Sequence, residues 1–194
     1  MKTKINTLYP HHVVSDYNSD IYIADYTEKT KSDPIKKGVD VNNIKHTDIE
    51  SFLVGNKNAI PFSTVKFDNK SFVDATTHKA LSQCECICFS SAEYSKGPWI
   101  LLLELKYCGL YSKYKKEKME EAKNQLIDTF KYYKDNGILN HKQQYYLVIS
   151  FPLLSPPFLN FTTTQEEVKK MKLKRVIFRC VNELKIKCEF KLEV

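Results

Sequence analysis

The sequence predicts an α/β (α+β) fold, a single domain in which a central mixed β-sheet is flanked by helices. Two apolar runs of strand length, residues 84–89 and 99–108, flank a short polar loop with a Lys-Gly-Pro turn signal and predict a buried β-hairpin. Residues 117–133 carry apolar side chains at helical spacing, and the apolar run 145–151 ends at Pro152. A helix between two buried strands indicates a crossover within a mixed sheet.

The remaining elements follow from local signals. Residues 1–44 show little periodicity and are interpreted as an N-terminal arm packed on, or extending, a core domain of residues 45–194. A short helix is expected over 47–53, because Thr47 and Glu50 have the spacing of a capping box. Residues 63–67 and 71–75 alternate weakly and predict a strand pair joined by a tight turn.

The C-terminal part is expected to contain one helix and two strands. Thr164 is a candidate N-cap for a helix over 165–172, and residues 176–180 have the composition of a strand. Apolar and polar residues alternate clearly over 184–194, which predicts an edge or half-exposed strand at the end of this core domain.

Composition limits the class of protein. At 194 residues, the chain suits one domain with a full hydrophobic core. No apolar run approaches the roughly 20 residues that a membrane-spanning helix needs, and the first residues lack the apolar segment of a secretory signal. We therefore expect a cytoplasmic protein without a membrane partner.

Three cysteines alternate in one predicted strand. Cys84, Cys86 and Cys88 should point to one face, with neighbours ~7 Å apart, too far for an unstrained disulfide between them. We interpret them as small buried apolar residues. A zinc site is the less favoured alternative, because the closely spaced cysteine pairs of such sites are absent.

Charged side chains interrupt the predicted hairpin at only three places. If the hairpin turns near Tyr94 and Ser95, antiparallel pairing sets Glu85 opposite Glu104. Lys106, two residues after Glu104, shares its strand face. Ionised groups are rarely left on an apolar hairpin unless they pair with each other or bind a metal, so the pattern indicates a metal-ion phosphodiesterase site.

An acidic residue followed by Glu-x-Lys on the neighbouring strand resembles the PD-(D/E)xK nuclease superfamily, which has the restriction-endonuclease-like fold. The resemblance covers roughly residues 45–152. It implies that Glu85 and Glu104 bind Mg²⁺ or Mn²⁺ and that Lys106 orients or deprotonates the attacking water. It also implies that Gln125, on the following helix, contacts the site.

The first acidic position leaves alternatives open. The family usually has Asp there, often after Pro, where this chain has Cys84 and Glu85. Asp74 is the rival, and Glu85 is favoured because the hairpin register places it directly. A glutamate on a preceding helix sometimes joins the family's metal site, and Glu50 is the candidate, although its capping role explains it without a metal.

The resemblance implies hydrolysis of nucleic-acid phosphodiesters, in DNA or alternatively in RNA, and the choice between the two stays open. The formal charge is +7, and a basic and aromatic cluster that follows the hairpin could contact phosphates and bases: Tyr111, Lys113, Tyr114, Lys115 and Lys116. The main alternative is a catalytically inactive subunit of the same fold that binds nucleic acid or a protein partner. A protein-interaction module and a homodimer also stay open.

Overall fold

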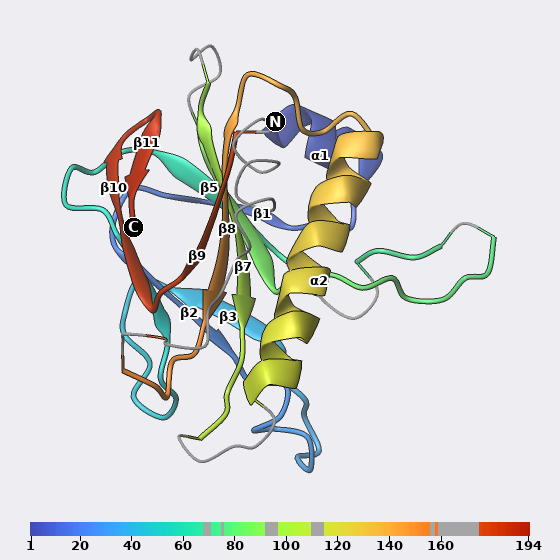
Figure 1. Cartoon of the computed structure of the whole chain (residues 1–194), viewed down its shortest axis with the longest axis vertical. Helices are drawn as coiled ribbons and strands as arrows, with labels where there is room; N and C mark the ends of the chain where they lie inside the picture. The colour runs from blue at the N-terminus through green and yellow to red at the C-terminus, as the bar shows by residue number, and fades with distance from the viewer. Residues whose placement is uncertain (68–70, 75, 92–96, 110–114, 156–157, 159–174) are drawn as a thin grey trace.

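The computed structural model describes residues 1–67, 71–74, 76–91, 97–109, 115–155, 158 and 175–194. Most of the described elements are strands, arranged in two sheets (Figure 1). The larger sheet has the strand order β1-β5-β6-β7-β8-β9. Its strands are β1 (Val14–Tyr17), β5 (Phe62–Lys66), β6 (Cys86–Ser90), β7 (Trp99–Leu105), β8 (Gln144–Ser150) and β9 (Val176–Cys180).

The larger sheet is mixed, as the sequence predicts. β6 and β7 form the expected antiparallel pair, and the 21-residue helix α2 (Lys115–Asp135) then leads to β8, which pairs with β7 in parallel. A parallel pair needs such a crossover, because the chain must return to the end of the sheet at which the first strand began, and a tight turn cannot span that distance. The predicted hairpin, helix and following strand are therefore confirmed.

A second sheet, which the sequence analysis does not anticipate, has the order β11-β10-β4-β2-β3. Its strands are β2 (Ile21–Asp25), β3 (Val39–Asn42), β4 (Phe52–Gly55), β10 (Glu183–Cys188) and β11 (Lys191–Glu193). The N-terminal 44 residues thus supply strands to both sheets, and the short helix α1 (Lys2–Leu8) buries Ile5 in the core.

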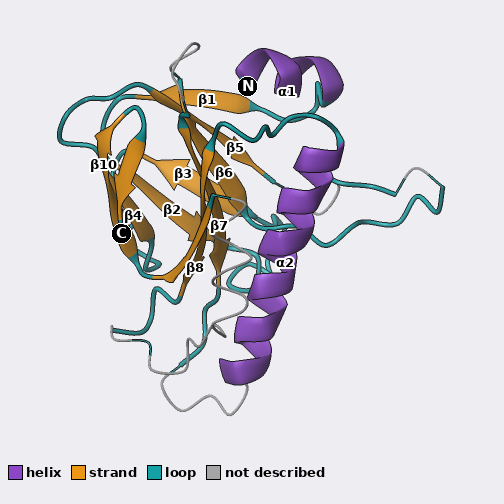
Figure 2. Ribbon diagram, turned by 45° about the horizontal axis from the view of Figure 1, so that its top comes forward, coloured by secondary structure: helices purple, strands orange, loops and turns teal. Residues whose placement is uncertain are grey.

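Two cores lie on opposite faces of the larger sheet. On one face lies α2 (Figure 2). Its Leu126 and Tyr133 share a core cluster with Ile100 and Leu102 of β7. On the other face, Leu101 and its strand neighbours pack against the second sheet. The chain is therefore a mixed α+β structure, and the prediction that helices flank the sheet is wrong for the face covered by strands.

Local signals misled the sequence analysis in three segments. The helix expected over 47–53 is absent, because residues 52–55 form β4 between β2 and β10, and sheet pairing overrides the capping-box pattern. In the segment expected to form a strand over 71–75, the described residues hold only an isolated bridge between Val73 and Ala80. Residues 184–194 form the hairpin β10–β11 rather than one strand.

The cysteines are free and those of the hairpin are buried, but they do not share one face. Cys86 and Cys88 lie in the core between the sheets, whereas Cys84 lies in the core beneath α2. The alternation breaks at Glu85, whose amide donates to the Leu103 carbonyl although Cys86 is the residue paired with Leu103. The predicted common face is therefore wrong for Cys84.

Candidate functional site

The β6–β7 hairpin brings two glutamates together. Ile87 lies opposite Leu102 and Cys86 opposite Leu103, which is the register predicted from the sequence, although the turn at residues 92–96 lies outside the described residues. Glu85 directly precedes β6, and its carbonyl accepts a hydrogen bond from the Phe67 amide at 2.9 Å. The residue after β5 and strand β7 therefore hold the backbone of Glu85, but the regular pairing ends at Cys86 and Leu103, so the predicted pairing of Glu85 with Glu104 is not part of the ladder.

Glu104 is the most unusual polar residue of the site. Its side chain is fully buried in the middle layer of the structure, with 0% exposure. Lys106 Nζ lies 2.9 Å from Glu104 Oε1 and forms an ion pair with it. Among the described residues, neither carboxylate oxygen of Glu104 has a hydrogen bond of normal geometry. An ionised carboxylate is costly to bury in this way, so Glu104 has capacity for a further ligand.

Helix α2 positions the lysine. Gln125 Oε1 accepts a hydrogen bond from Lys106 Nζ at 2.7 Å, and Gln125 Nε2 donates to the Gln83 carbonyl at 3.1 Å. Glu121, one turn earlier on α2, accepts a 3.2 Å bond from the same ammonium. The structure thus brings Glu104, Lys106 and Gln125 into one network, as the resemblance implies.

Burial and like charges shift the acid–base properties of this network. Burial, followed by the charge of Glu104, raises the pKa of Glu85 well above its ordinary value. Burial also raises the pKa of Glu104 to about 7, although Lys106 opposes the shift. Burial acts to lower the pKa of Lys106, but the carboxylates of Glu104 and Glu121 outweigh it and raise that pKa. The site therefore holds protons that ordinary glutamates would release.

An open cleft of about 850 Å³ reaches this network from solvent. The larger sheet contributes Glu85 and Lys106, and α2 contributes Lys118, Glu121 and Gln125. The opposite wall is built by the end of β2 and the chain that follows it, with Asp25, Glu28, Lys31, Lys36 and Lys37. The cleft therefore combines acidic residues, Asp25 and Glu85 among them, with several lysines, whereas the fully buried Glu104 does not line it.

Asp25 is a site residue that the sequence analysis missed. It ends β2 in the second sheet and lines the same cleft as Glu85. Its charge contributes to the raised pKa of both Glu85 and Glu104. The only local signal was an aspartate after an apolar strand-like run, Ile21 to Ala24, inside a segment interpreted as an irregular arm.

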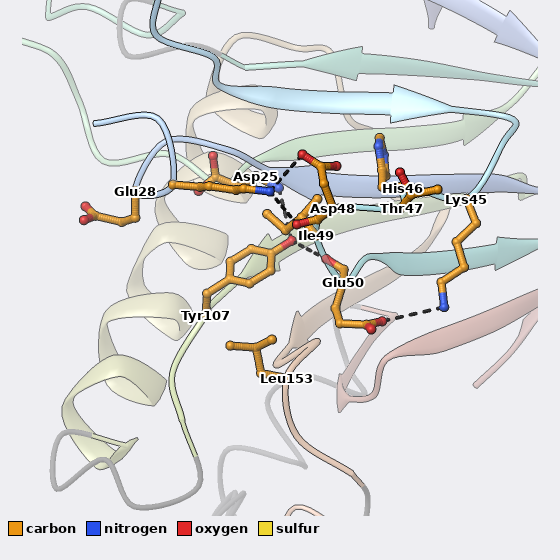
Figure 3. Close-up of a pocket in the computed structure, with 11 residues that line it drawn as sticks. Asp25, Glu28, Lys45, His46, Thr47, Asp48, Ile49, Glu50, Tyr107 and Leu153 are labelled. Atoms are coloured by element: carbon orange, nitrogen blue, oxygen red, sulfur yellow. Dashed lines mark hydrogen bonds and ion pairs between the residues drawn. The ribbon is translucent and has the colours of Figure 1, made fainter. Parts of the chain in front are cut away.

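A neighbouring pocket, drawn in Figure 3, shares Asp25, Glu28 and Tyr107 with the cleft. The Tyr107 hydroxyl accepts a hydrogen bond from the Asp25 amide at 3.3 Å and donates to the Glu50 carbonyl at 2.8 Å. Tyr107 thereby ties the chain that follows β7 to the end of β2 in the second sheet. The carboxylate of Glu50 lies in this neighbouring pocket, 3.7 Å from Lys45 Nζ, and not in the cleft.

The structure places Asp74 in a local turn. Its Oδ1 accepts hydrogen bonds from the amides of Thr76 and Thr77, at 3.0 and 2.6 Å. Asp74 does not line the cleft, whereas Glu85 does. The geometry therefore favours Glu85 over its rival Asp74 as the acid that accompanies Glu104, and Glu50, the candidate for an additional ligand, does not line the cleft.

The predicted nucleic-acid cluster is only partly visible. Tyr111, Lys113 and Tyr114 lie outside the described residues, and Lys115 is the first residue of α2. Lys116 is exposed on the first turn of that helix. Lys118, one half-turn later, lines the cleft.

The two glutamates, Glu85 in the cleft and Glu104 buried beside Lys106, suit a hard cation. Glu85 and Glu104 offer carboxylate oxygens, which Mg²⁺ and Mn²⁺ prefer, and Mg²⁺ is commonly held by one or two carboxylates with water and phosphate oxygens. The buried carboxylate of Glu104 without a well-formed hydrogen bond fits this role. Within the described part of the chain, no group of three or more His, Cys, Asp or Glu side chains has the arrangement of a metal site.

Comparison with known proteins gives no match: no family model matches the chain, and neither does any curated protein or solved structure. In the described part of the chain, neither helix is long and apolar enough to cross a membrane.

Proposed function

We propose that the chain is a metal-dependent nuclease of the PD-(D/E)xK type that hydrolyses phosphodiester bonds of nucleic acid, either DNA or RNA. One observation carries the proposal: the fully buried carboxylate of Glu104, without a well-formed hydrogen bond among the described residues, is paired with Lys106, and Lys106 and Glu85 both line the cleft. A buried ionisable pair with shifted pKa values in a cleft is the arrangement typical of acid–base chemistry.

Glu85 and Glu104 are the residues that would hold Mg²⁺ or Mn²⁺. When bound, such an ion supplies positive charge to the phosphate and lowers the pKa of water. Cation binding would favour the ionised form of both glutamates, because it adds the opposite charge that their buried surroundings lack.

Lys106 is the proton-handling group of the proposal. Its ammonium has three N–H donors, and Glu104, Gln125 and Glu121 all lie within 3.2 Å of Nζ. Because Gln125 is itself anchored to the Gln83 carbonyl, it can hold the ammonium in place if Glu104 turns toward another ligand. Lys106 would then orient a water molecule toward the phosphate or neutralise the charge that develops there.

A catalytically inactive subunit that binds nucleic acid or a protein partner is the second candidate. It is favoured by Glu at a position where the family usually has Asp, and by the high pKa of Glu85 and of Glu104, which opposes cation binding at neutral pH. In this case the lysines of the cleft would bind the partner, and Glu85 and Glu104 would remain protonated.

Cleavage assays distinguish the two candidates. Single- and double-stranded DNA and RNA are incubated with the wild type, Glu104→Gln, Lys106→Met and the control Glu120→Gln, in Mg²⁺, Mn²⁺ or EDTA. Glu120 is an exposed residue of α2 outside the cleft. The nuclease proposal expects metal-dependent cleavage by the wild type and the control, and loss of at least about 100-fold in the other two variants. Absence of cleavage by the folded wild type would favour the inactive subunit.

A further inference from the structure

The wall of the cleft opposite α2 is built by the β2–β3 connection, residues 26–38. In Figure 1 this connection lies beside the lower, N-terminal end of α2. It contains four lysines, Lys29, Lys31, Lys36 and Lys37, against the two acids Glu28 and Asp33. Lys29 is engaged by Asp48 at 2.8 Å and belongs to the neighbouring pocket, whereas the other three lysines line the cleft.

These three lysines are exposed and only weakly held by acids of the chain. Lys31 Nζ lies 3.4 Å from Glu28, in a pair whose members are both mostly exposed. Lys37 Nζ lies 5.5 Å from the centre of the Tyr26 ring. Lys36 forms no ion pair with any described residue. Exposed pairs of this kind are worth at most about 1 kcal/mol, so the ammonium groups are available to an anion.

The backbone that carries the lysines is well fixed. Thr30 is buried, and its hydroxyl donates to the Tyr26 carbonyl at 2.9 Å and accepts from the Lys37 amide at 2.8 Å. The Tyr26 amide donates to the Gly38 carbonyl at 3.1 Å, which closes the base of the connection. A preorganised wall loses little conformational entropy when a ligand binds.

The charges of the cleft are arranged by depth. Asp25 and Glu85 line it near the buried Glu104, while Lys31, Lys36, Lys37 and, across the cleft, Lys118 carry exposed ammonium groups. A small anion needs only one such cation. An extended polyanion can contact several lysines while one phosphate approaches Glu85.

We infer that the β2–β3 connection is the substrate-binding wall of the cleft, where Lys31, Lys36 and Lys37 contact successive phosphates of a nucleic-acid backbone. This inference rests on the proposed function, because it names the substrate contacts of the same cleft. It assigns binding to a segment before the hairpin, in addition to the lysines that follow it.

The test compares two triple variants of equal charge change. The wall variant, Lys31→Gln/Lys36→Gln/Lys37→Gln, removes the three ammonium groups of the wall. The control variant, Lys185→Gln/Lys187→Gln/Lys191→Gln, removes three exposed lysines from β10 and β11, at the opposite edge of the second sheet. Binding of fluorescently labelled DNA and RNA strands, single and duplex, is measured by anisotropy over a range of salt concentrations. Ca²⁺ replaces Mg²⁺, and circular dichroism verifies folding.

The wall variant is expected to lose at least about tenfold in affinity. The slope of its log affinity against log salt concentration should decrease in magnitude by about three. The control variant should keep most of the affinity of the wild type. Unchanged binding by the wall variant, an equal loss in both variants, or a wild type that binds no nucleic acid would overturn the inference. Wall-dependent binding without metal-dependent cleavage would instead refute only the nuclease proposal.

Discussion

Replacing Glu104 by glutamine should stabilise the metal-free protein at alkaline pH while removing its activity. Glutamine has nearly the same shape as glutamate and carries no charge, so the packing of this fully buried side chain is preserved. The pKa of Glu104 rises from 4.5 to about 7 on folding. At about 1.4 kcal/mol for each pKa unit, ionised Glu104 destabilises the folded chain by about 3 kcal/mol.

The sign of the pH dependence follows from the direction of the shift. Between pH 4.5 and about 7, the folded state retains the proton of Glu104 and the unfolded state has released it. The contribution of Glu104 to the free energy of unfolding is therefore greatest below pH 4.5, falls as pH rises, and is lost above about pH 7. Glu85, whose pKa is also raised, acts in the same direction.

Urea denaturation in EDTA measures the effect. At pH 8, Glu104→Gln should have a free energy of unfolding up to about 3 kcal/mol greater than the wild type, and at pH 4.5 the two should nearly coincide. The matched variant Glu120→Gln changes an exposed glutamate and should differ from the wild type by less than about 1 kcal/mol at both pH values. A Glu104→Gln variant that is less stable than the wild type at pH 8 would refute the reasoning.

Three further predictions follow from the contacts of the site. Gln125→Ala removes the hydrogen-bond partner 2.7 Å from Lys106 Nζ and should slow metal-dependent cleavage by about tenfold or more, while the free energy of unfolding falls by at most about 2 kcal/mol. An unchanged rate would exclude Gln125 as a positioning residue. Asp25→Asn removes a like charge and should lower the pKa of Glu85, which a carboxyl NMR titration would show; an unmoved titration would place Asp25 too far away. Thr129→Val removes the acceptor of the buried Cys84 amide, which now donates to Thr129 Oγ1 at 2.8 Å, and should lower the free energy of unfolding by about 1 to 3 kcal/mol. A neutral effect in urea denaturation would show that this contact does not hold the segment leading to Glu85.

The hairpin, α2 and β8 could be predicted because each forms around a continuous local pattern. β7 is buried on both faces and reads as an uninterrupted apolar run, and α2 buries residues at helical spacing against it. The hairpin register was predicted from an assumed turn, and the observed pairing of Ile87 with Leu102 has that register. These elements carry Glu104, Lys106 and Gln125, so the network among them could be anticipated.

The second sheet could not be predicted, because its pairing joins segments far apart in the sequence. β4 lies between β2 and β10, and its residues 52–55 are too few to outweigh a capping-box pattern at Thr47 and Glu50. β1 and β3 have four residues each and are only partly buried, so they lack a strong apolar alternation. The wall of the cleft, with Asp25, depends on this sheet and was missed with it.

The break of alternation at Glu85 has a related cause. Strand periodicity assumes a regular ladder, whereas the Glu85 amide bonds the carbonyl of Leu103 rather than following the register of β6. Irregular pairing of this kind turns a strand locally and redirects side chains. It sends Cys84 beneath α2 and leaves Glu85 at the cleft, an arrangement that the sequence does not encode in any short motif.

Titration of Mn²⁺ into the metal-free protein, followed by calorimetry in two buffers of different ionisation enthalpy, tests most directly whether Glu85 and Glu104 form a cation site. At pH 7, the wild type and Glu120→Gln should bind Mn²⁺ and release on the order of one proton for each ion, because carboxylates with raised pKa values must ionise to bind. Glu104→Gln should lose most of this binding. A folded wild type that takes up no Mn²⁺, or an equal titration by Glu104→Gln, would contradict the account.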